Sequence, residues 1–446
     1  MKRAAQGSRT NIPGGMATHL PEGASLRRYA QGTILSIFFK WGYKEVVTPV
    51  FEYLDILAAG LSSGLLEKSY KFVDRESGKL MILRPDITPQ VSRMAAGILS
   101  DEPKPLRLCY YGNVFRYEES HAGREREMFQ MGCELVGTSA PEADAEIIAV
   151  ASEAVRGLGI DDFKIVIGQV GYLCGIVSFL KDSYGQNLLP ENEQTLQEAI
   201  VKRDVDLIES ILDHIGITGK TKKNILQIPT LFGGEEIFDK ALQIARNKDS
   251  AKAIENLRQI CSILRLHQLT DHVLFDLCDI RGIDYYSGLF FEIFSPGMAY
   301  PIGRGGRYDT LIGRFGHECP STGFAIDIES IIMAKEKQGR SFTDSGIHYL
   351  IIGDKKDHGL IIEIGRELRG AGCRVIMDTE GQDADASVDY AKKNKIEKVI
   401  VIQGEKVKEY SVIDVKTGKK TKVSKEKIIP SHPPLLKKGE RKLRSR

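Results

Sequence analysis

The sequence predicts an α+β body that carries a helical insertion and is followed by a small α/β domain. Three observations support this fold class. Between residues 24 and 158, a helical pattern is followed by several short strand patterns and then by a second helical pattern. Residues 185–270 are charged and carry apolar residues at helical spacing. Residues 345–428 alternate strand and helix patterns, which favours a largely parallel sheet.

Length and composition fit this organisation. The chain has 446 residues, of which 42% are hydrophobic and 27% charged, the balance of a folded globular protein. At roughly 150 residues per domain, about three domains are expected. The apolar run at residues 33–39 is far shorter than the ~18 residues of a membrane span, and the N-terminus lacks the apolar core of a secretory signal. Met16 is an alternative to Met1 as the start, because the residues between them are polar and patternless.

Cysteine usage points to the cytoplasm. The seven cysteines are scattered and form no Cys-x-x-Cys pair, which argues against a zinc site and against a disulfide framework. Neither a metal nor a cofactor is expected.

The charge is near zero overall but unevenly distributed. The formal net charge of +2 excludes a protein that is basic throughout. Residues 416–446 carry twelve Lys or Arg against two Asp or Glu, a net +10, so the rest of the chain carries −8. We expect residues 429–446 to be a basic flexible tail, since Pro430, Pro433 and Pro434 break regular structure there. An electrostatic arm for nucleic acid or an acidic partner is the alternative.

In the body, a first helix is expected over residues 24–41, where Gly42 ends it. The elements expected after it are strands at Leu80–Leu83, Leu106–Tyr111 and Glu127–Val136, a helix at 141–158, strands within 273–295, a glycine turn at Arg304–Arg307, and a strand leading into a helix over 321–336.

In the C-terminal domain, strands and helices are expected to alternate after the polar linker Lys335–Ser345. The expected elements are strands at Ile347–Ile352, Cys373–Met377 and Lys398–Ile402 and helices at Leu360–Leu368 and Val388–Lys393.

Unusual polar residues concentrate between residues 115 and 134. Gln130 and Glu134 lie four apart on an expected strand and therefore point to one face of a sheet, and Arg116 can face them across the hairpin. Buried polar groups of this kind need partners. Ion pairing on an exposed hairpin is the simpler alternative.

Other segments add candidates. Asp86 and Thr88 are expected on one face, and residues 279–288 contribute Arg281, Tyr285 and Tyr286. The glycine-rich stretch 303–309 lacks the spacing of either nucleotide fingerprint, so a tight turn is its simplest interpretation.

In this order, the segments resemble the histidyl-tRNA synthetase family of class II aminoacyl-tRNA synthetases. The similar segments are residues 41–49 for motif 1, at that family's dimer interface, 110–134 for motif 2, 281–286 for the histidine motif and 305–309 for the motif that follows it. The resemblance implies a class II synthetase-like domain at 16–335 with the helical insertion at about 185–270, and an anticodon-binding-like domain at 345–428. It also implies a six- or seven-stranded antiparallel sheet flanked by helices, and a dimer.

The resemblance further implies a histidine pocket. Its implied members are Asp86, Thr88 and Gln130 for the α-amino group, Glu134, Tyr286 and the adjacent Tyr285 for the imidazole, and Arg281 and Arg116 for the carboxylate. Motif 3 of the family departs here, because Ser330 stands where an arginine grips the ATP phosphates and Asp327 replaces a glycine. A lost phosphate clamp and an added carboxylate both disfavour nucleotide binding, so no catalytic residue is expected.

A retained amino-acid pocket with a lost ATP clamp is similar to the regulatory subunits of ATP phosphoribosyltransferase, the glycosyltransferase that begins histidine biosynthesis. This likeness implies a non-catalytic chain that binds L-histidine as feedback inhibitor. It implies assembly with a short-form catalytic subunit, as dimers within a hetero-octamer, and no binding of tRNA or membrane.

Two alternatives stay open. An active histidine–tRNA ligase is favoured by Arg116, Arg124, the C-terminal domain and the basic tail. A synthetase-like module that senses histidine elsewhere in the cell is the third possibility.

Overall fold

The computed structural model describes residues 12–117, 125–185, 189–245, 247–279, 286–339, 346–381, 383–404 and 409–428. The chain separates into two compact units, residues 1–339 and 340–446. Among the described helices, none combines the length and the apolar character that crossing a bilayer requires. Four sequence-based expectations concern residues outside the described ranges: Arg124, Arg281, Tyr285 and the tail 429–446.

The first unit is built on a nine-stranded mixed sheet. Its strands in spatial order are β1 (Lys44–Glu45), β5 (Leu106–Phe115), β6 (Glu127–Val136), β12 (Ser321–Asp327), β11 (Gly303–Arg307), β10 (Leu289–Phe294), β7 (Lys164–Gln169), β9 (Val273–Asp276) and β8 (Phe232–Gly233). The six strands from β5 to β7 are antiparallel throughout. The short strands β1, at one edge, and β9 and β8, at the other end, bring the total above the six or seven that the resemblance implies. Strands β1 and β9 pair in parallel with β5 and β7.

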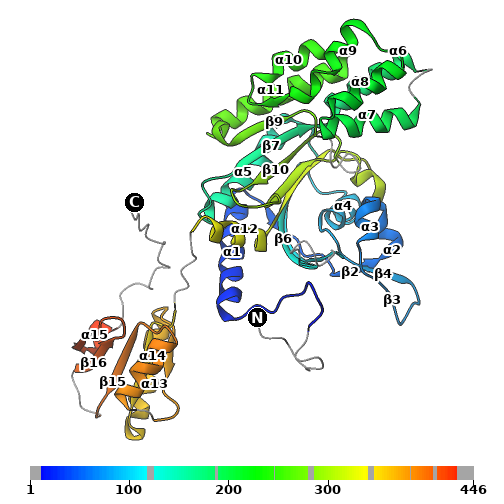
Figure 1. Ribbon diagram of the computed structural model, residues 1–446. Helices are drawn as coiled ribbons and strands as arrows, with labels where there is room; N and C mark the ends of the chain where they lie inside the picture. The colour runs from blue at the N-terminus through cyan, green and yellow to red at the C-terminus, as the bar shows by residue number, and fades with distance from the viewer. Residues whose placement is uncertain are drawn as a thin grey trace. The chain divides into compact units, whose positions relative to one another are not determined.

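Helix α5 (Pro141–Gly157) covers one face of the central strands, and α1 (Pro21–Lys40), α11 (Lys248–Leu266) and α12 (Ile328–Lys337) pack around it and the sheet (Figure 1). Proline at the start of α5 and acidic residues in its first turn favour helix initiation there. The α1 ring of Phe38 meets Phe324 of β12 edge to face at 5.8 Å, a favourable aromatic geometry. The helices and the mostly antiparallel sheet confirm the predicted fold class.

The opposite face carries α4 (Thr88–Ala96). Strand alternation shows this on β5, where Leu108 and Tyr110 pack with Ile87 and Val91 beside α4, whereas Arg107 bonds to α5. Next to α4 lie a small sheet and short helices: β2 (Phe51–Tyr53), β4 (Leu80–Leu83), β3 (Lys71–Val73), α2 (Leu54–Leu57), α3 (Ser63–Glu67) and the 3₁₀ turns η1 (Ala58–Gly60) and η5 (Ile312–Phe315).

A group of helices lies beside the β9 end of the sheet (Figure 1). The helices that join α11 are α6 (Val170–Tyr184), α7 (Pro190–Lys202), α8 (Val205–His214), α9 (Gly219–Ile225) and α10 (Ile237–Ile244), with the 3₁₀ turns η3 (Ile228–Thr230) and η4 (Thr270–His272). Their apolar residues recur at helical spacing and are buried, as Ile208, Ile211 and Leu212 of α8 illustrate.

The second unit has a five-stranded sheet with helices on both faces. The strands in order are β14 (Val375–Met377), β13 (Tyr349–Gly353), β15 (Lys398–Ile402), β16 (Glu409–Asp414) and β17 (Lys420–Ser424); the helices are η6 (Lys355–Asp357), α13 (His358–Gly370), α14 (Ala384–Lys393) and α15 (Lys425–Ile428). Strands β14, β13 and β15 are parallel, as the alternating pattern predicts. The antiparallel β16–β17 hairpin was not predicted, because its lysines and threonines hide the apolar alternation.

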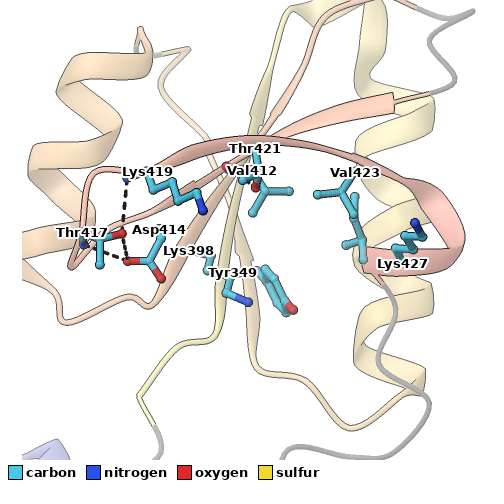
Figure 2. Close-up of a pocket in the computed structure, with 10 residues that line it drawn as sticks. Tyr349, Lys398, Val412, Asp414, Thr417, Lys419, Thr421, Val423 and Lys427 are labelled. Atoms are coloured by element: carbon cyan, nitrogen blue, oxygen red, sulfur yellow. Dashed lines mark hydrogen bonds between the residues drawn. The ribbon is translucent and has the colours of Figure 1, made fainter.

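This unit has a groove with about 400 Å³ of water-accessible space (Figure 2). Tyr349 and Val412 line it from the sheet, and Lys398, Lys419 and Lys427 contribute ammonium groups. Apolar side chains and lysines therefore line the groove together.

Candidate functional site

Glycines on three neighbouring central strands leave room above the α4 face of the sheet. Gly132, Gly306 and Gly323 share this face, because residues paired directly across strands point the same way. A Cβ atom at Gly323 would lie 1.7 Å from Glu134 Oε2, and one at Gly306 would lie 2.8 Å from the Tyr286 ring. These glycines therefore let large polar side chains lie against the strands. The expected glycine turn at Arg304–Arg307 was wrong: the segment lies within strand β11, and its glycines serve this close approach.

Glu134 is the centre of the site. Its side chain comes from β6 and is almost fully buried, with 1% of the residue exposed. Oε1 accepts hydrogen bonds from Thr88 Oγ1 at 2.6 Å and from the Tyr110 hydroxyl at 3.2 Å. Oε2 accepts one from the Tyr308 hydroxyl. Three neutral donors thus converge on one carboxyl group.

Burial controls the ionisation of Glu134. Loss of hydration raises the pKa of its carboxyl to about 8, the negative charge of Asp86 acts in the same direction, and the hydroxyl donors oppose them. At neutral pH the group is therefore largely protonated in the free protein. A ligand that carries a positive charge or a strong donor would favour its ionised form.

A second polar pair lies beside Glu134. Asp86 Oδ1 accepts from the Ile87 amide at 2.8 Å and from Gln130 Nε2 at 3.0 Å. Gln130 Oε1 in turn accepts from the same amide at 3.2 Å. Thr88 begins helix α4, so Asp86 and Thr88 reach one network through a strand-to-helix turn. Proline at the second helical position suits this start.

Tyr286 and Arg116 lie at the border of this network. The Tyr286 ring stacks on Phe290 with centroids 5.9 Å apart. Burial and the nearby charge of Asp86 raise the pKa of the Tyr286 hydroxyl above its usual value, so it remains a neutral donor. Arg116 Nε donates to the Pro85 carbonyl at 2.7 Å, which ties its side chain to the residue before Asp86.

The structure thus brings together Asp86, Thr88, Gln130, Glu134 and Tyr286, with Arg116 at their edge. Arg281 and Tyr285 lie outside the described residues. Sequence reasoning missed Tyr110 and Tyr308. Tyr110 alternates with Leu108 on the buried face of β5, and Tyr308 directly follows the glycines of β11, so both carried a usable signal.

The end of β12 carries carboxylates. The likeness to synthetases predicted that a phosphate-binding arginine is lost at this place. Asp327 Oδ1 accepts from the Ser330 amide at 2.7 Å and so caps α12. Glu329 Oε2 accepts from the Phe129 amide at 3.0 Å, and its Oε1 lies 2.8 Å from Arg27 Nε. This edge of the site thus carries two carboxylates, with the guanidinium of Arg27 beside that of Glu329.

The chain is similar to known proteins of one family. The family model described as histidyl-tRNA synthetase matches residues 15–331. Proteins named ATP phosphoribosyltransferase regulatory subunit are 38% identical over 94% of this chain and 94% of theirs in Geobacter sulfurreducens, and 38% identical over 88% of this chain and 89% of theirs in Geobacter metallireducens.

Solved structures share the fold. A Bacillus halodurans chain described as an ATP phosphoribosyltransferase regulatory subunit/histidyl-tRNA synthetase has a TM-score of 0.77 at 24% identity, covering 89% of this chain and 99% of that one. A histidyl-tRNA synthetase from Nostoc sp. has a TM-score of 0.79 at 21% identity, covering 94% and 99%. The chain therefore belongs to the histidyl-tRNA synthetase family and, within it, to the group of ATP phosphoribosyltransferase regulatory subunits.

Proposed function

We propose that this chain is a non-catalytic regulatory subunit of ATP phosphoribosyltransferase and that it binds L-histidine around Glu134. One observation carries the proposal: the buried carboxyl of Glu134, with its three hydroxyl donors, lies beside the carboxylate of Asp86, which Gln130 of the same strand as Glu134 holds. Zwitterionic histidine presents an ammonium, a carboxylate and an imidazole edge, and these need complementary partners when water is excluded.

The role of each residue follows from its position. Asp86 offers a carboxylate to the ammonium, and Gln130 holds that carboxylate in place at 3.0 Å. Glu134 would accept from the imidazole, and the hydroxyls that fix it, from Thr88 and Tyr308, set its orientation. The ligand carboxylate is assigned to Arg281 and Arg116, and Tyr285 is assigned to the imidazole together with Tyr286.

The absence of catalysis is proposed from the end of β12. A nucleotide triphosphate would meet the carboxylates of Asp327 and Glu329, and at short range like charges repel. Arg27 is already engaged by Glu329. We infer that ATP-dependent activation of histidine does not take place here.

The proposed partner is a short-form catalytic subunit, which this chain would activate in a cytoplasmic hetero-octamer and inhibit when histidine is bound. Such feedback is a coupling free energy between two sites, typically about 1–3 kcal/mol. The expected result is that a short catalytic subunit mixed with this chain synthesises phosphoribosyl-ATP, and that L-histidine inhibits the mixture. An unchanged rate on addition of this chain would overturn the proposal.

Self-association is proposed through the small sheet beside α4. Phe51, Tyr53 and Phe72 share one face of its three short strands and are exposed, Phe51 to 49%. An apolar patch of this kind marks an interface, and it borders residues 41–49, which resemble the dimer motif of the family. A second copy is the occupant we propose.

Phe72→Glu is therefore expected to convert the dimer to a monomer, because it places a charge in the apolar interface. Leu266→Glu is the matched control, since Leu266 is 83% exposed at the end of α11, away from this sheet. Sedimentation equilibrium distinguishes the two. A wild-type monomer, or a Phe72→Glu dimer, would contradict the proposed face.

The alternative activity, histidine–tRNA ligation, draws support from the groove of the second unit, where Lys398, Lys419 and Lys427 would suit a polyanion (Figure 2). Histidine-dependent exchange between ATP and pyrophosphate separates the two functions. A positive exchange would favour the ligase, and its absence is expected here because of Asp327 and Ser330.

A further inference from the structure

Three potential metal ligands meet at the carboxyl end of β12. His19 comes from the segment before α1, Glu125 from the residues before β6, and Glu329 from the first turn of α12. Each offers one ligand atom, and these atoms all lie within 4.8 Å of one another. The segment that carries His19 is held there independently, because the Arg126 amide donates to the Gly15 carbonyl at 2.6 Å.

A fourth carboxylate next to this cluster has one oxygen without a hydrogen bond from the described residues. Asp327 Oδ2 is enclosed by protein and accepts no hydrogen bond from the described residues, whereas Oδ1 caps α12. Glu329 Oε1 is also enclosed; Arg27 Nε approaches it to 2.8 Å, but without the alignment of a hydrogen bond. Protein groups thus leave acceptor capacity unused on two neighbouring carboxylates, which is unusual in a buried position.

The local charge is negative. Glu125, Asp327 and Glu329 contribute three carboxylates, and Arg27 and Arg116 are the guanidinium groups that act on them. Three carboxylates against two guanidinium groups leave a formal net charge of −1, which a bound cation would offset.

We propose that His19, Glu125 and Glu329 bind one divalent first-row transition-metal ion, such as Mn²⁺ or Zn²⁺. An imidazole combined with carboxylates suits these ions better than Mg²⁺ or Ca²⁺, which prefer oxygen ligands alone. Ligand atoms on opposite sides of an ion with bonds of about 2.1 Å lie roughly 4.2 Å apart, so a small side-chain adjustment closes the observed spread. Asp327 lies close enough to the cluster to neutralise the ion further.

The ion would join three parts of the chain that are far apart in sequence: the segment before α1, the start of β6 and the start of α12. This metal site goes beyond the proposed regulatory function, and it departs from the expectation that the chain binds no metal. It does not depend on histidine binding, since none of its three ligands belongs to the network around Glu134.

Titration of the untagged, chelator-treated full chain with Mn²⁺, followed by electron paramagnetic resonance of the free ion, tests the proposal. One Mn²⁺ per chain is expected to bind. His19→Ala and Glu329→Gln are each expected to weaken binding at least tenfold, because each removes a ligand. His317→Ala and Glu318→Gln are the matched controls, since both residues are exposed and lie outside the cluster, and they should bind as the wild type does.

No saturable Mn²⁺ or Zn²⁺ binding by the wild type would overturn the proposal, as would equal affinity in the cluster variants and the controls. His19→Ala guards against a folding artefact, because it alters a segment outside the helices and strands. Loss of Mn²⁺ binding in His19→Ala with an unchanged melting temperature would support a site. L-histidine titration of metal-free protein reports on the regulatory pocket separately.

Discussion

Glu134→Gln is expected to weaken L-histidine binding by about 100-fold, roughly 3 kcal/mol. Glutamine has nearly the same shape, and the hydroxyls of Thr88, Tyr110 and Tyr308 can still bond to its amide. What it lacks is the negative charge that the imidazole pair needs. Titration calorimetry measures the loss. Glu134→Ala should abolish binding while leaving folding largely intact.

The pH dependence of binding gives a sharper test. Free imidazole titrates near pH 6.5, and burial raises the pKa of Glu134 to about 8. Between these two pH values Glu134 is protonated and the imidazole of free histidine is neutral. The two groups together therefore already hold the single proton that they share when histidine is bound. Below about 6.5 binding must release a proton, and above about 8 it must take one up. Affinity should therefore be highest between pH 6.5 and 8 and fall about tenfold per pH unit on either side.

Glu134→Gln should lose the alkaline decline that belongs to the carboxyl, whereas the titration of the ligand's own amino group stays common to both proteins. An identical alkaline slope in the variant and the wild type would show that Glu134 does not share the proton.

The pH dependence of the free energy of unfolding provides the control for folding. Because its folded pKa is raised from 4.5, the stabilisation from protonated Glu134 is complete below pH 4.5 and is lost as pH rises through about 8. The variant should therefore gain stability relative to wild type across that window.

Much of the fold follows from local patterns. The strand Glu127–Val136 and the strand Lys398–Ile402 have the predicted bounds, because apolar and polar residues there match the period of a buried strand. The same period of two placed Gln130 and Glu134 on one face. Such features depend on residues close in sequence, and a single sequence contains them.

The parts that were missed depend on distant contacts. Gly306 looked like a turn residue, yet its reason for being glycine is the ring of Tyr286 and the neighbouring strand β10. Tyr308 joins Glu134 across 174 positions of sequence. No local pattern reports such a pairing, and only the register of β11, β12 and β6 brings the two residues together. Strand period predicts which face a residue occupies, whereas its partner on that face is a property of the tertiary fold.

Arg307→Ala is expected to destabilise the protein by about 3–5 kcal/mol, the usual consequence of leaving one buried charge without its partner. Arg307 is only 7% exposed and extends from β11 to α5. Its Nε donates to Asp144 Oδ2 at 3.0 Å, and Nη1 donates to the Thr138 carbonyl and to Asp309 Oδ1, each at 3.0 Å. Truncation would leave the carboxylate of Asp144, a residue that is only 1% exposed, without its guanidinium partner.

Arg304→Ala is the matched control, since Arg304 lies three residues earlier on the same strand and forms an ion pair with Glu292 in contact with water. Exposed pairs contribute about 0–1 kcal/mol, so urea unfolding should separate the two variants by at least 2 kcal/mol. Burial raises the pKa of Asp144 even beside Arg307, and removing the guanidinium raises it further. Stability from the protonated form is present at low pH and lost as pH rises, so the penalty of Arg307→Ala should grow with pH.

Adding Asp144→Asn to Arg307→Ala should recover part of the loss, because the double variant leaves no buried charge. Equal penalties for Arg304→Ala and Arg307→Ala, or a double variant no more stable than Arg307→Ala, would contradict a buried ion pair.

Tyr308 follows Arg307 directly and bonds to Glu134, so the ion pair between β11 and α5 also positions a donor of the proposed histidine site. Arg307→Ala should therefore weaken L-histidine binding under conditions in which the variant is still folded, whereas Arg304→Ala should leave it less affected.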